Sequence, residues 1–210
     1  MPKNACSELG FGAGVVGRLL PQRPPMLMVD AVQDYRALPR PSLRASRAVS
    51  PVEPWVAGHF PGLPILPGAL IIEGLAQSCG LLRALVALED AAVEDGRRAD
   101  WLPAALANLE RGYRLKPGYD PSLAAELDER CAARRSGGLG VLGAAQVKLL
   151  RPVVPGERLD YQVALTRELG ELWHCEVAAS VAGEPVASGS LVLGRTTGPL
   201  PSLADEPAAG

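Results

Sequence analysis

The chain has 210 residues, of which 48% are hydrophobic and 21% are charged, so it is long for one domain and too short for two full ones. Its formal net charge of −2 gives no overall basic surface and argues against nucleic-acid binding. Four cysteines without a C-x-x-C pair and two histidines form no zinc pattern, so we predict no metal site. The first residues lack the layout of a signal peptide, and we expect a cytoplasmic protein.

The first quarter of the chain predicts short elements. We expect residues 1–13 to be flexible, a short helix over 15–20, and strands over 26–32 and 43–49. Proline and glycine then interrupt an otherwise apolar stretch over 50–67. This composition predicts a stiff loop rather than a helix or strand.

An apolar segment opens at Gly68 and continues to residue 88 as GALIIEGLAQSCGLLRALVAL. Its length would span a bilayer. It also contains Glu73, Gln77 and Arg83, and a charge near the middle of a span is costly. We therefore predict the buried central helix of a soluble domain, with no membrane span.

The second half of the chain changes to an alternating pattern. We interpret residues 91–138 as an insertion that forms a strand pair, because apolar and polar residues alternate near 104–116 and 122–134. Strands are expected over 139–150, 157–168, 171–181 and 186–193, with turns at residues 169–170 and 182–183. Residues 196–210 are predicted to be a disordered tail.

This order of elements predicts an α+β fold in which a curved antiparallel sheet wraps one long helix. A single domain would then cover residues 14–195, with the insertion at 91–138. A helix that is apolar on nearly every side must be buried all round, and one sheet can bury only part of its surface. We therefore expect a second copy of the chain, or a homologous one, to complete it.

Three groups with complementary chemistry lie between residues 53 and 77. His59 in the stiff loop is a candidate base. The N–H of Gly68, at the start of the helix, is a candidate donor to a carbonyl oxygen that gains negative charge. Glu73 lies among apolar residues that favour its protonated form, and Gln77 at i+4 can orient it. Each residue alone is more often structural than catalytic, and composition does not bring them together in space.

Three segments resemble a known family, the beta-hydroxyacyl-acyl-carrier-protein dehydratases of the hotdog fold. They are LLPQRPPMLMVDAV (19–32), EPWVAGHFPGLPILPGALIIEGLAQ (53–77) and VKLLRPVVPGERL (147–159), in the family's order. The resemblance covers roughly residues 15–90 and 139–193. A glutamate at position 73 is similar to the Z-type thioester dehydratases, whereas the related dehydratase/isomerases have aspartate there.

The resemblance implies an enzyme that converts 3-hydroxyacyl thioesters on an acyl carrier protein to trans-2-enoyl thioesters. His59 and Glu73 match the catalytic residues, Gly68 the thioester-binding glycine, and Gln77 and Phe60 supporting positions. Family members form dimers, with each active site built from the histidine of one chain and the acid of the other. A homodimer, a heterodimer with a homologous subunit, or a higher oligomer is therefore expected.

The resemblance also implies that no metal or redox cofactor is needed and that phosphopantetheine carries the substrate into an apolar tunnel. Acidic carrier proteins are commonly held by basic side chains. Four arginines are candidates for that contact: Arg23, Arg44, Arg47 and Arg151.

Two features of the chain depart from the family pattern. Gln22 stands where a histidine is common, and R-P-P-M at 23–26 replaces frequent aromatic residues, which leaves the substrate chain length open. The insertion at 91–138 is the larger departure. Fatty-acid synthesis and a specialised polyketide or polyene pathway both remain open. So do a thioesterase or isomerase on the same fold and a non-catalytic partner subunit.

Overall fold

The computed structural model describes residues 10–136, 138 and 140–196 of the chain. Four helices and six strands are present in this described part. The helices are α1 (Ala13–Leu19), α2 (Gly68–Glu94), α3 (Trp101–Tyr113) and α4 (Pro121–Ser136). The strands are β1 (Ala31–Arg36), β2 (Ser42–Ala48), β3 (Gly140–Leu149), β4 (Arg158–Leu169), β5 (Leu172–Val181) and β6 (Glu184–Arg195). The predicted α+β class is confirmed.

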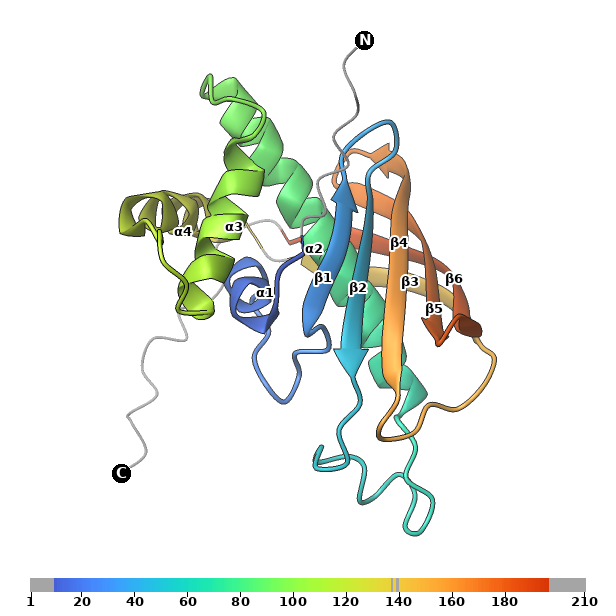
Figure 1. Ribbon diagram of the computed structural model, residues 1–210. Coiled ribbons are helices and arrows are strands. Elements are labelled where there is room, and N and C mark those ends of the chain that lie inside the picture. The colour runs from blue at the N-terminus through green and yellow to red at the C-terminus, as the bar shows by residue number, and fades with distance from the viewer. Residues whose placement is uncertain (1–9, 137, 139, 197–210) are drawn as a thin grey trace, which may run out of the picture.

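The six strands form one antiparallel sheet in the order β1-β2-β4-β5-β6-β3 (Figure 1). The period-two pattern predicted for β4 and β5 is confirmed, because alternate residues from Leu159 and from Trp173 onward are buried. Gly170 and Gly183 have positive φ angles of 56° and 84° in the predicted turns, a conformation that glycine adopts without strain. In this strand order, β3 lies at one edge of the sheet, next to β6.

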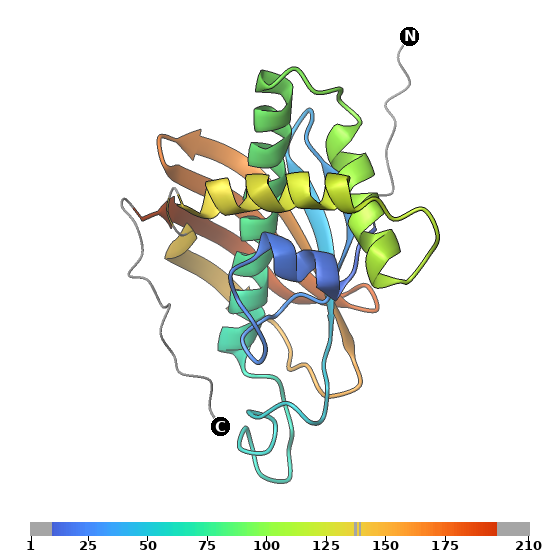
Figure 2. The same cartoon turned by 90° about the vertical axis from the view of Figure 1, so that its left-hand side faces the viewer.

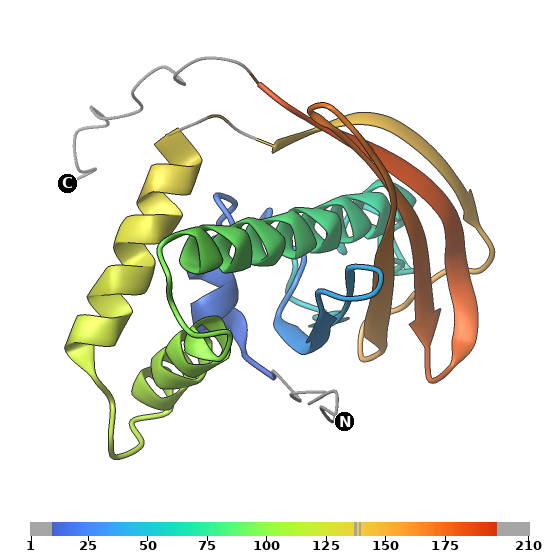
Figure 3. The ribbon, with the colours of Figure 1, turned by 90° about the horizontal axis from the view of Figure 1, so that it is seen from above.

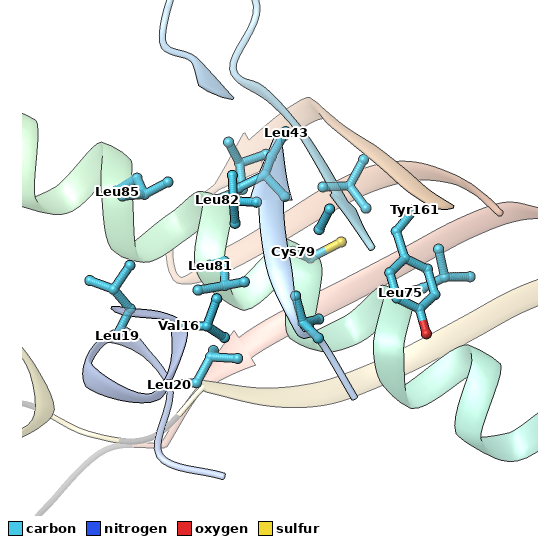
Figure 4. Close-up of a cluster of buried hydrophobic side chains, with 14 of the residues drawn as sticks. Val16, Leu19, Leu20, Leu43, Leu75, Cys79, Leu81, Leu82, Leu85 and Tyr161 are labelled. Carbon is cyan, nitrogen blue, oxygen red and sulfur yellow. The ribbon is translucent and has the colours of Figure 1, made fainter. Parts of the chain in front are cut away.

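Helix α2 lies on the concave face of the curved sheet, as Figure 3 shows from above. α1, α3 and α4 cover the side of α2 that faces away from the sheet (Figure 2). The core therefore forms on two sides of α2, with Val16 and Leu19 of α1 on one side and Leu43 of β2 on the other (Figure 4).

Gly74 lets one strand approach α2 closely. A Cβ atom at this position would lie 2.1 Å from the hydroxyl oxygen of Tyr161 on β4. Tyr161 is completely buried, and burial raises the pKa of its hydroxyl well above the usual value. The glycine therefore sets the depth at which α2 sits on the sheet, and with it the position of Glu73 next to it in the chain.

The length and composition of α2 are those of a membrane-spanning helix. In its most apolar 18-residue window, 56% of the residues are buried inside the protein. Together with the sheet and helices packed around it, this identifies α2 as the buried central helix that the sequence predicts. α2 also runs six residues past position 88, to Glu94.

The strand pair predicted within 91–138 is wrong, because the segment forms α3 and α4. The buried residues of α3 recur at helical spacing, from Trp101 and Leu102 through Ala105 and Leu106 to Leu109. Asp120 accepts a hydrogen bond from the Ser122 N–H at 2.8 Å, as an N-cap does at the start of a helix. The alternation that suggested strands came from short alanine-rich runs, in which apolar residues also satisfy the 3.6-residue period.

Two boundaries in the first part of the chain also differ from prediction. The strand expected over 26–32 begins later, at Ala31. Residues 10–13, expected to be flexible, are held in place: Phe11 is 3% exposed and exchanges two backbone hydrogen bonds with Val32. Residues 1–9 and the tail predicted over 196–210 lie outside the described residues, apart from Thr196.

Candidate active site

The stiff loop over residues 50–67 carries His59 and projects beyond the sheet before the chain enters α2 (Figure 1). Two backbone hydrogen bonds between Phe60 and Leu63, both at 2.9 Å, close a tight turn. Gly62 in this turn has a φ of +79°, which explains the glycine. The Leu66 N–H donates to the carbonyl of Val153 at 2.8 Å, so the third matched segment holds the end of the loop.

The loop also determines which nitrogen of His59 can act as a base. Nδ1 of His59 lies 3.1 Å from the carbonyl oxygen of Ile65. A carbonyl oxygen only accepts hydrogen bonds, so Nδ1 carries the proton and Nε2 of the neutral ring keeps a free lone pair. Phe60 stacks on the imidazole with ring centroids 4.4 Å apart. The hydrogen bond therefore identifies Nε2 as the nitrogen of His59 that is available to accept a proton.

Gly68 is the first residue of α2, as predicted. Within the described part of the chain, no acceptor is found for its N–H, as is usual for the first residues of a helix. A Cβ atom at this position would lie 2.3 Å from Cδ1 of Leu149. Only glycine therefore fits between the helix start and the end of β3 without moving that leucine.

Gln77 orients Glu73 through hydrogen bonds that use both ends of its amide. Its Oε1 accepts from the Met28 N–H at 2.7 Å, and its Nε2 donates to the Met26 carbonyl at 2.7 Å. Nε2 also donates to Oε1 of Glu73 at 2.8 Å. Because backbone groups fix both ends of this amide, its orientation is determined, and the predicted contact between Gln77 and Glu73 is confirmed. Glu73 itself is half-buried.

Glu73 and Gln77 line a cavity of about 300 Å³ beside α2. We call it the α2 cavity. Its wall consists of one face of α2 as far as Asp90, residues 20–22 after α1, Arg134 of α4, Trp173 of β5, Glu168 of β4, and the adjoining ends of β3 and β6. The insertion thus supplies part of the wall that surrounds the candidate acid.

His59 and Gly68 do not line the α2 cavity. One protomer therefore brings Glu73 and Gln77 together but leaves His59 outside, at the loop before α2. Strand β3 pairs with β6 on one side, and within the described residues its other edge is unpaired. Its side chains are exposed, including Val141, Leu142 and Leu149 at 38–48%. Such an edge is a ready site for pairing with another chain.

The four candidate arginines occupy different environments. Arg47 is wrong as a carrier-protein contact, because it is 5% exposed and forms a buried ion pair with Glu53 at 2.8 Å. Arg44 is exposed but lies on the outer face of β2, opposite the core residue Leu43. Arg151 is bound to Glu157 at 3.3 Å. Arg23 is exposed, directly follows the cavity residue Gln22, and donates hydrogen bonds through NH1 to the carbonyls of residues 20–22.

The buried Arg47 instead stabilises the backbone segment that binds Gln77. Its NH1 donates to the Leu27 carbonyl at 2.7 Å, next to the Met28 that binds Gln77. Its partner Glu53 also accepts hydrogen bonds from the Ser50 N–H at 3.1 Å and from Trp55 Nε1 at 2.6 Å. One buried ion pair therefore connects residues 26–28 to the start of the stiff loop over residues 50–67.

Other reactive side chains have structural surroundings. Cys79, Cys131 and Cys175 are buried cysteines. The hydrogen bond with Cys175, followed by burial, raises the pKa of the Cys79 thiol and keeps it protonated. His174 lies on the face of β5 opposite Trp173 and Cys175. Among the described residues, no three metal-binding side chains cluster together.

Several cavity residues were not identified from the sequence. Gly80 follows Glu73 at i+7 and Gln77 at i+3, so helical spacing alone could have placed it on the same face. Arg83 was noted only as a charge within the helix. Trp173 was assigned to the core, and Arg134 lies in the misread insertion. Those two positions depend on how α4 and the sheet pack against α2, which no local pattern contains.

The central helix on the concave face of an antiparallel sheet defines the hotdog class of fold. A similar arrangement occurs in a dehydratase heterocomplex, ApeI:P, from Xenorhabdus doucetiae. The TM-score is 0.55 and the sequence identity 18%, over 87% of this chain and 91% of that chain. This likeness concerns the fold.

Sequence comparison then identifies the family. A FabA-like domain is matched over residues 20–103. The chain is 33% identical over 180 residues to the 3-hydroxyacyl-[acyl-carrier-protein] dehydratase FabZ of Anaeromyxobacter dehalogenans, covering 85% of this chain and 87% of that protein. It is 30% identical to the same-named protein of Myxococcus xanthus over 179 residues, with 85% and 88% coverage. The chain belongs to the 3-hydroxyacyl-[acyl-carrier-protein] dehydratase family.

Proposed function

We propose that the protein is a hydro-lyase that dehydrates 3-hydroxyacyl chains on an acyl carrier protein to trans-2-enoyl thioesters, in the cytoplasm. The observation that carries the proposal is the hydrogen-bonded series from Met26 and Met28 through Gln77 to Glu73. It holds a carboxyl group in one orientation at the wall of a cavity. A thioesterase would not need such an acid to protonate a departing hydroxyl group.

In the proposed reaction, Nε2 of His59 removes a proton from the carbon next to the thioester carbonyl. The N–H of Gly68, at the positive end of α2, stabilises the negative charge that develops on the carbonyl oxygen. Glu73 donates a proton to the C3 hydroxyl group as the C3–O bond breaks, and water leaves. The C2–C3 double bond forms from the electron pair of the lost C–H bond. His59 then returns its proton to Glu73 through solvent.

The reaction leaves the substrate in the same overall oxidation state, because one water molecule is lost and no electrons are exchanged. We therefore propose that no metal or redox cofactor takes part and that phosphopantetheine carries the substrate. Arg23 is our first candidate for the carrier-protein contact, since it is exposed and directly follows Gln22 of the cavity wall. Arg151 and Arg44 are weaker candidates, because Arg151 binds Glu157 and Arg44 faces away from the cavity.

The active site is proposed to be shared between two chains. Within one protomer His59 does not line the cavity that holds Glu73, whereas the unpaired edge of β3 offers a surface for a second sheet. A homodimer joined along β3, or a heterodimer with a homologous subunit, would bring the loop of one chain to the acid of the other. A homodimer is the simpler proposal, since this chain has both His59 and Glu73.

The activity is tested with purified protein and a 3-hydroxyacyl-pantetheine thioester, with enoyl absorbance as the readout. We expect turnover, with its loss in His59→Ala and in Glu73→Gln. The matched controls are His174→Ala on the outer face of β5 and Glu94→Gln at the exposed end of α2, which should retain activity. Release of free thiol without enoyl product would identify a thioesterase instead, and no turnover of any substrate would support the partner-subunit alternative.

The shared site is tested by co-expressing the two inactive variants with different affinity tags and isolating the mixed dimer. Such a dimer has one site with two altered residues and one site with both catalytic residues intact. Restored turnover is therefore expected if the site is shared. An inactive mixed dimer would show that His59 and Glu73 of the same chain act together.

A further inference from the structure

The connection between α3 and α4 carries an exposed surface that the proposed reaction does not use. We call residues 111–119 the α3–α4 platform. Its side chains of Tyr113, Leu115 and Tyr119 are 48%, 93% and 44% exposed, and the segment contains three basic residues and no acidic one. In Figure 3 this connection lies on the side of the molecule away from the sheet. A dimer joined along β3 would therefore leave the platform uncovered.

The two tyrosines of the platform are seated on glycines. A Cβ atom at Gly14 of α1 would lie 2.6–2.7 Å from three atoms of the Tyr113 ring, and one at Gly112 would lie 2.7 Å from the nearest atom of the Tyr119 ring. The hydroxyl group of Tyr113 also accepts a hydrogen bond from Nε of Arg18 at 3.0 Å. Each ring is thus held in place although it is partly exposed. A rigid aromatic surface loses little conformational entropy when a partner binds.

Leu115 has a backbone conformation that is costly for a leucine. Its φ angle is +53°, in the left-handed region that glycine adopts more easily at the end of a helix. The Leu115 N–H donates to the Gly112 carbonyl at 3.0 Å, and the Lys116 N–H donates to the Arg111 carbonyl at 2.9 Å. The exposed side chain gains no burial in return. Local strain without a gain in packing is a pointer to function, and here a partner that covers the leucine would explain it.

Side-chain hydrogen bonds hold the rest of the platform. The buried Asn108 donates to the Asp120 carbonyl at 2.7 Å and accepts from the Asp120 N–H at 2.7 Å. NH1 of Arg111 donates to the Gly118 carbonyl at 3.0 Å. The platform therefore presents its exposed side chains in one arrangement, which lowers the entropic cost of binding a partner.

The charge of the platform favours an acidic partner. Arg114 binds Oε1 of Glu110 at 2.6 Å, and Oε2 of the same carboxylate accepts from the Gly12 N–H at 2.9 Å. Arg114 is nevertheless 61% exposed. Lys116 is exposed and forms no ion pair within the described residues. Basic side chains beside exposed apolar ones complement a partner that presents apolar residues among acidic ones.

We propose that the α3–α4 platform binds the acidic surface of the acyl carrier protein that delivers the substrate. This inference rests on the proposed function, in which the substrate is attached to that protein. Tyr113 packs on Gly14 in α1, and Arg23 follows the end of the same short helix. α1 therefore links the platform to the arginine already proposed as a carrier-protein contact.

The platform also lies at a suitable distance from the α2 cavity. Helix α4 begins beside the platform at Pro121, and Arg134 of the cavity wall lies 13 residues later. A helix rises 1.5 Å per residue, so this separation is about 20 Å. The phosphopantetheine arm has about 13 bonds and extends roughly 16 Å, at about 1.2 Å per bond. A carrier protein that covers the platform and the few ångströms beyond it could place its arm in the cavity.

The experiment compares one 3-hydroxyacyl group on two carriers, a bacterial fatty-acid acyl carrier protein and free pantetheine. We expect the wild-type protein to have a kcat/KM about tenfold or more higher for the carrier-bound substrate. Leu115→Gly and Lys116→Glu should each lower this kcat/KM about fivefold to tenfold, mainly through KM. The kcat/KM for the pantetheine substrate should change less than twofold. Titration calorimetry with the carrier protein should show the same loss of affinity.

Leu115→Gly keeps the test independent of folding. Glycine suits the positive φ angle at this position, so the variant should have an unchanged or higher Tm while its turnover of the carrier-bound substrate falls. The matched controls are Leu38→Ser between β1 and β2, where the leucine is 82% exposed, and Arg98→Glu before α3, where the arginine is 86% exposed. Both controls should keep wild-type kcat/KM values for both substrates.

The outcomes separate this inference from the proposed function. If both platform variants keep the wild-type kcat/KM for the carrier-bound substrate, the inference is wrong although the protein is a dehydratase. An equal loss for both substrates would also overturn it, because the effect would then lie in the reaction and not in docking. If the wild-type protein dehydrates neither substrate, the proposed function fails, and the calorimetric titration still decides whether the platform binds the carrier protein.

A lipid surface is the alternative occupant that the experiment must exclude. Vesicles of phosphatidylglycerol present negative charge and apolar chains, and co-sedimentation measures binding to them. Binding by the wild-type protein that is lost in Leu115→Gly, together with unchanged turnover of the carrier-bound substrate, would identify a lipid-binding surface and overturn the inference. We expect no co-sedimentation of either protein.

Discussion

The two ends of the α2 cavity treat buried polar groups in opposite ways. Around Glu73, the amide of Gln77 makes three hydrogen bonds, and its orientation leaves no alternative. Elsewhere in the cavity wall, Oε1 of Gln22 and Nε1 of Trp173 are buried and have no partner in the described part of the chain. A satisfied network is rigid and suits a group that must meet a reacting atom. Buried polar atoms without a partner lower the stability, because they have left water without gaining a new hydrogen bond.

The largest effect is expected at the satisfied end, in Glu73→Gln. A glutamine has the same shape and can still contact Gln77, but it cannot donate an acidic proton. We expect kcat to fall about a thousandfold, with KM changed little. Steady-state kinetics of enoyl formation measures both constants. If kcat falls less than tenfold, Glu73 is not the acid that protonates the leaving hydroxyl group.

Arg47→Met tests how much the buried ion pair with Glu53 contributes to stability near Gln77 and Glu73. The substitution leaves Glu53 charged and buried, since the Glu53 side chain is 10% exposed. Breaking a buried ion pair in this way should lower the free energy of unfolding by about 3–5 kcal/mol. Urea unfolding measures the loss. Arg167→Met, at an exposed position of β4, is the control and should change the free energy of unfolding by less than about 0.5 kcal/mol.

Gln77→Leu removes the positioning residue while keeping its approximate volume. The Met28 N–H and Met26 carbonyl would lose their partners, so we expect the free energy of unfolding to fall by about 1–3 kcal/mol. With Glu73 no longer oriented, kcat should fall about tenfold and KM should stay nearly constant. A variant that loses stability but keeps the wild-type kcat would show that Gln77 has a structural role only.

Gln22→Leu makes the same chemical change at the unsatisfied end, and here the smallest effect is expected. The variant removes a buried acceptor that has no partner within the described residues, so no hydrogen bond is lost. The free energy of unfolding should stay the same or rise by up to about 1 kcal/mol. Urea unfolding beside Gln77→Leu measures the contrast. A similar loss in both variants would show that the two ends do not differ.

Much of the fold could be predicted because its signals are local. Alternation over β4 and β5 identifies strands with one buried face, and Pro67–Gly68 marks the start of α2. The apolar length of α2 predicts a helix that other elements must cover. The i, i+4 spacing of Glu73 and Gln77 places them on one helix face, and their hydrogen bond follows from that spacing.

The insertion could not be predicted in the same way. Short alanine-rich runs with scattered polar residues fit both the strand and the helix period, so α3 and α4 were misread as strands. Arg47 was also misread, because a charged residue on an edge-proximal strand is usually exposed. Its burial depends on Glu53, which the chain brings back to it across the loop.

The sequence by itself thus determined the family, the central helix, the main strands and the residues His59, Gly68, Glu73 and Gln77 as candidates, because each is encoded within a short continuous segment. Only the tertiary structure decided which side chains line the α2 cavity. Gln22, Arg134 and Trp173 come from three distant parts of the chain and meet beside α2. Whether a polar atom has a hydrogen-bond partner depends on contacts between distant segments, and a local sequence pattern contains no information about such contacts.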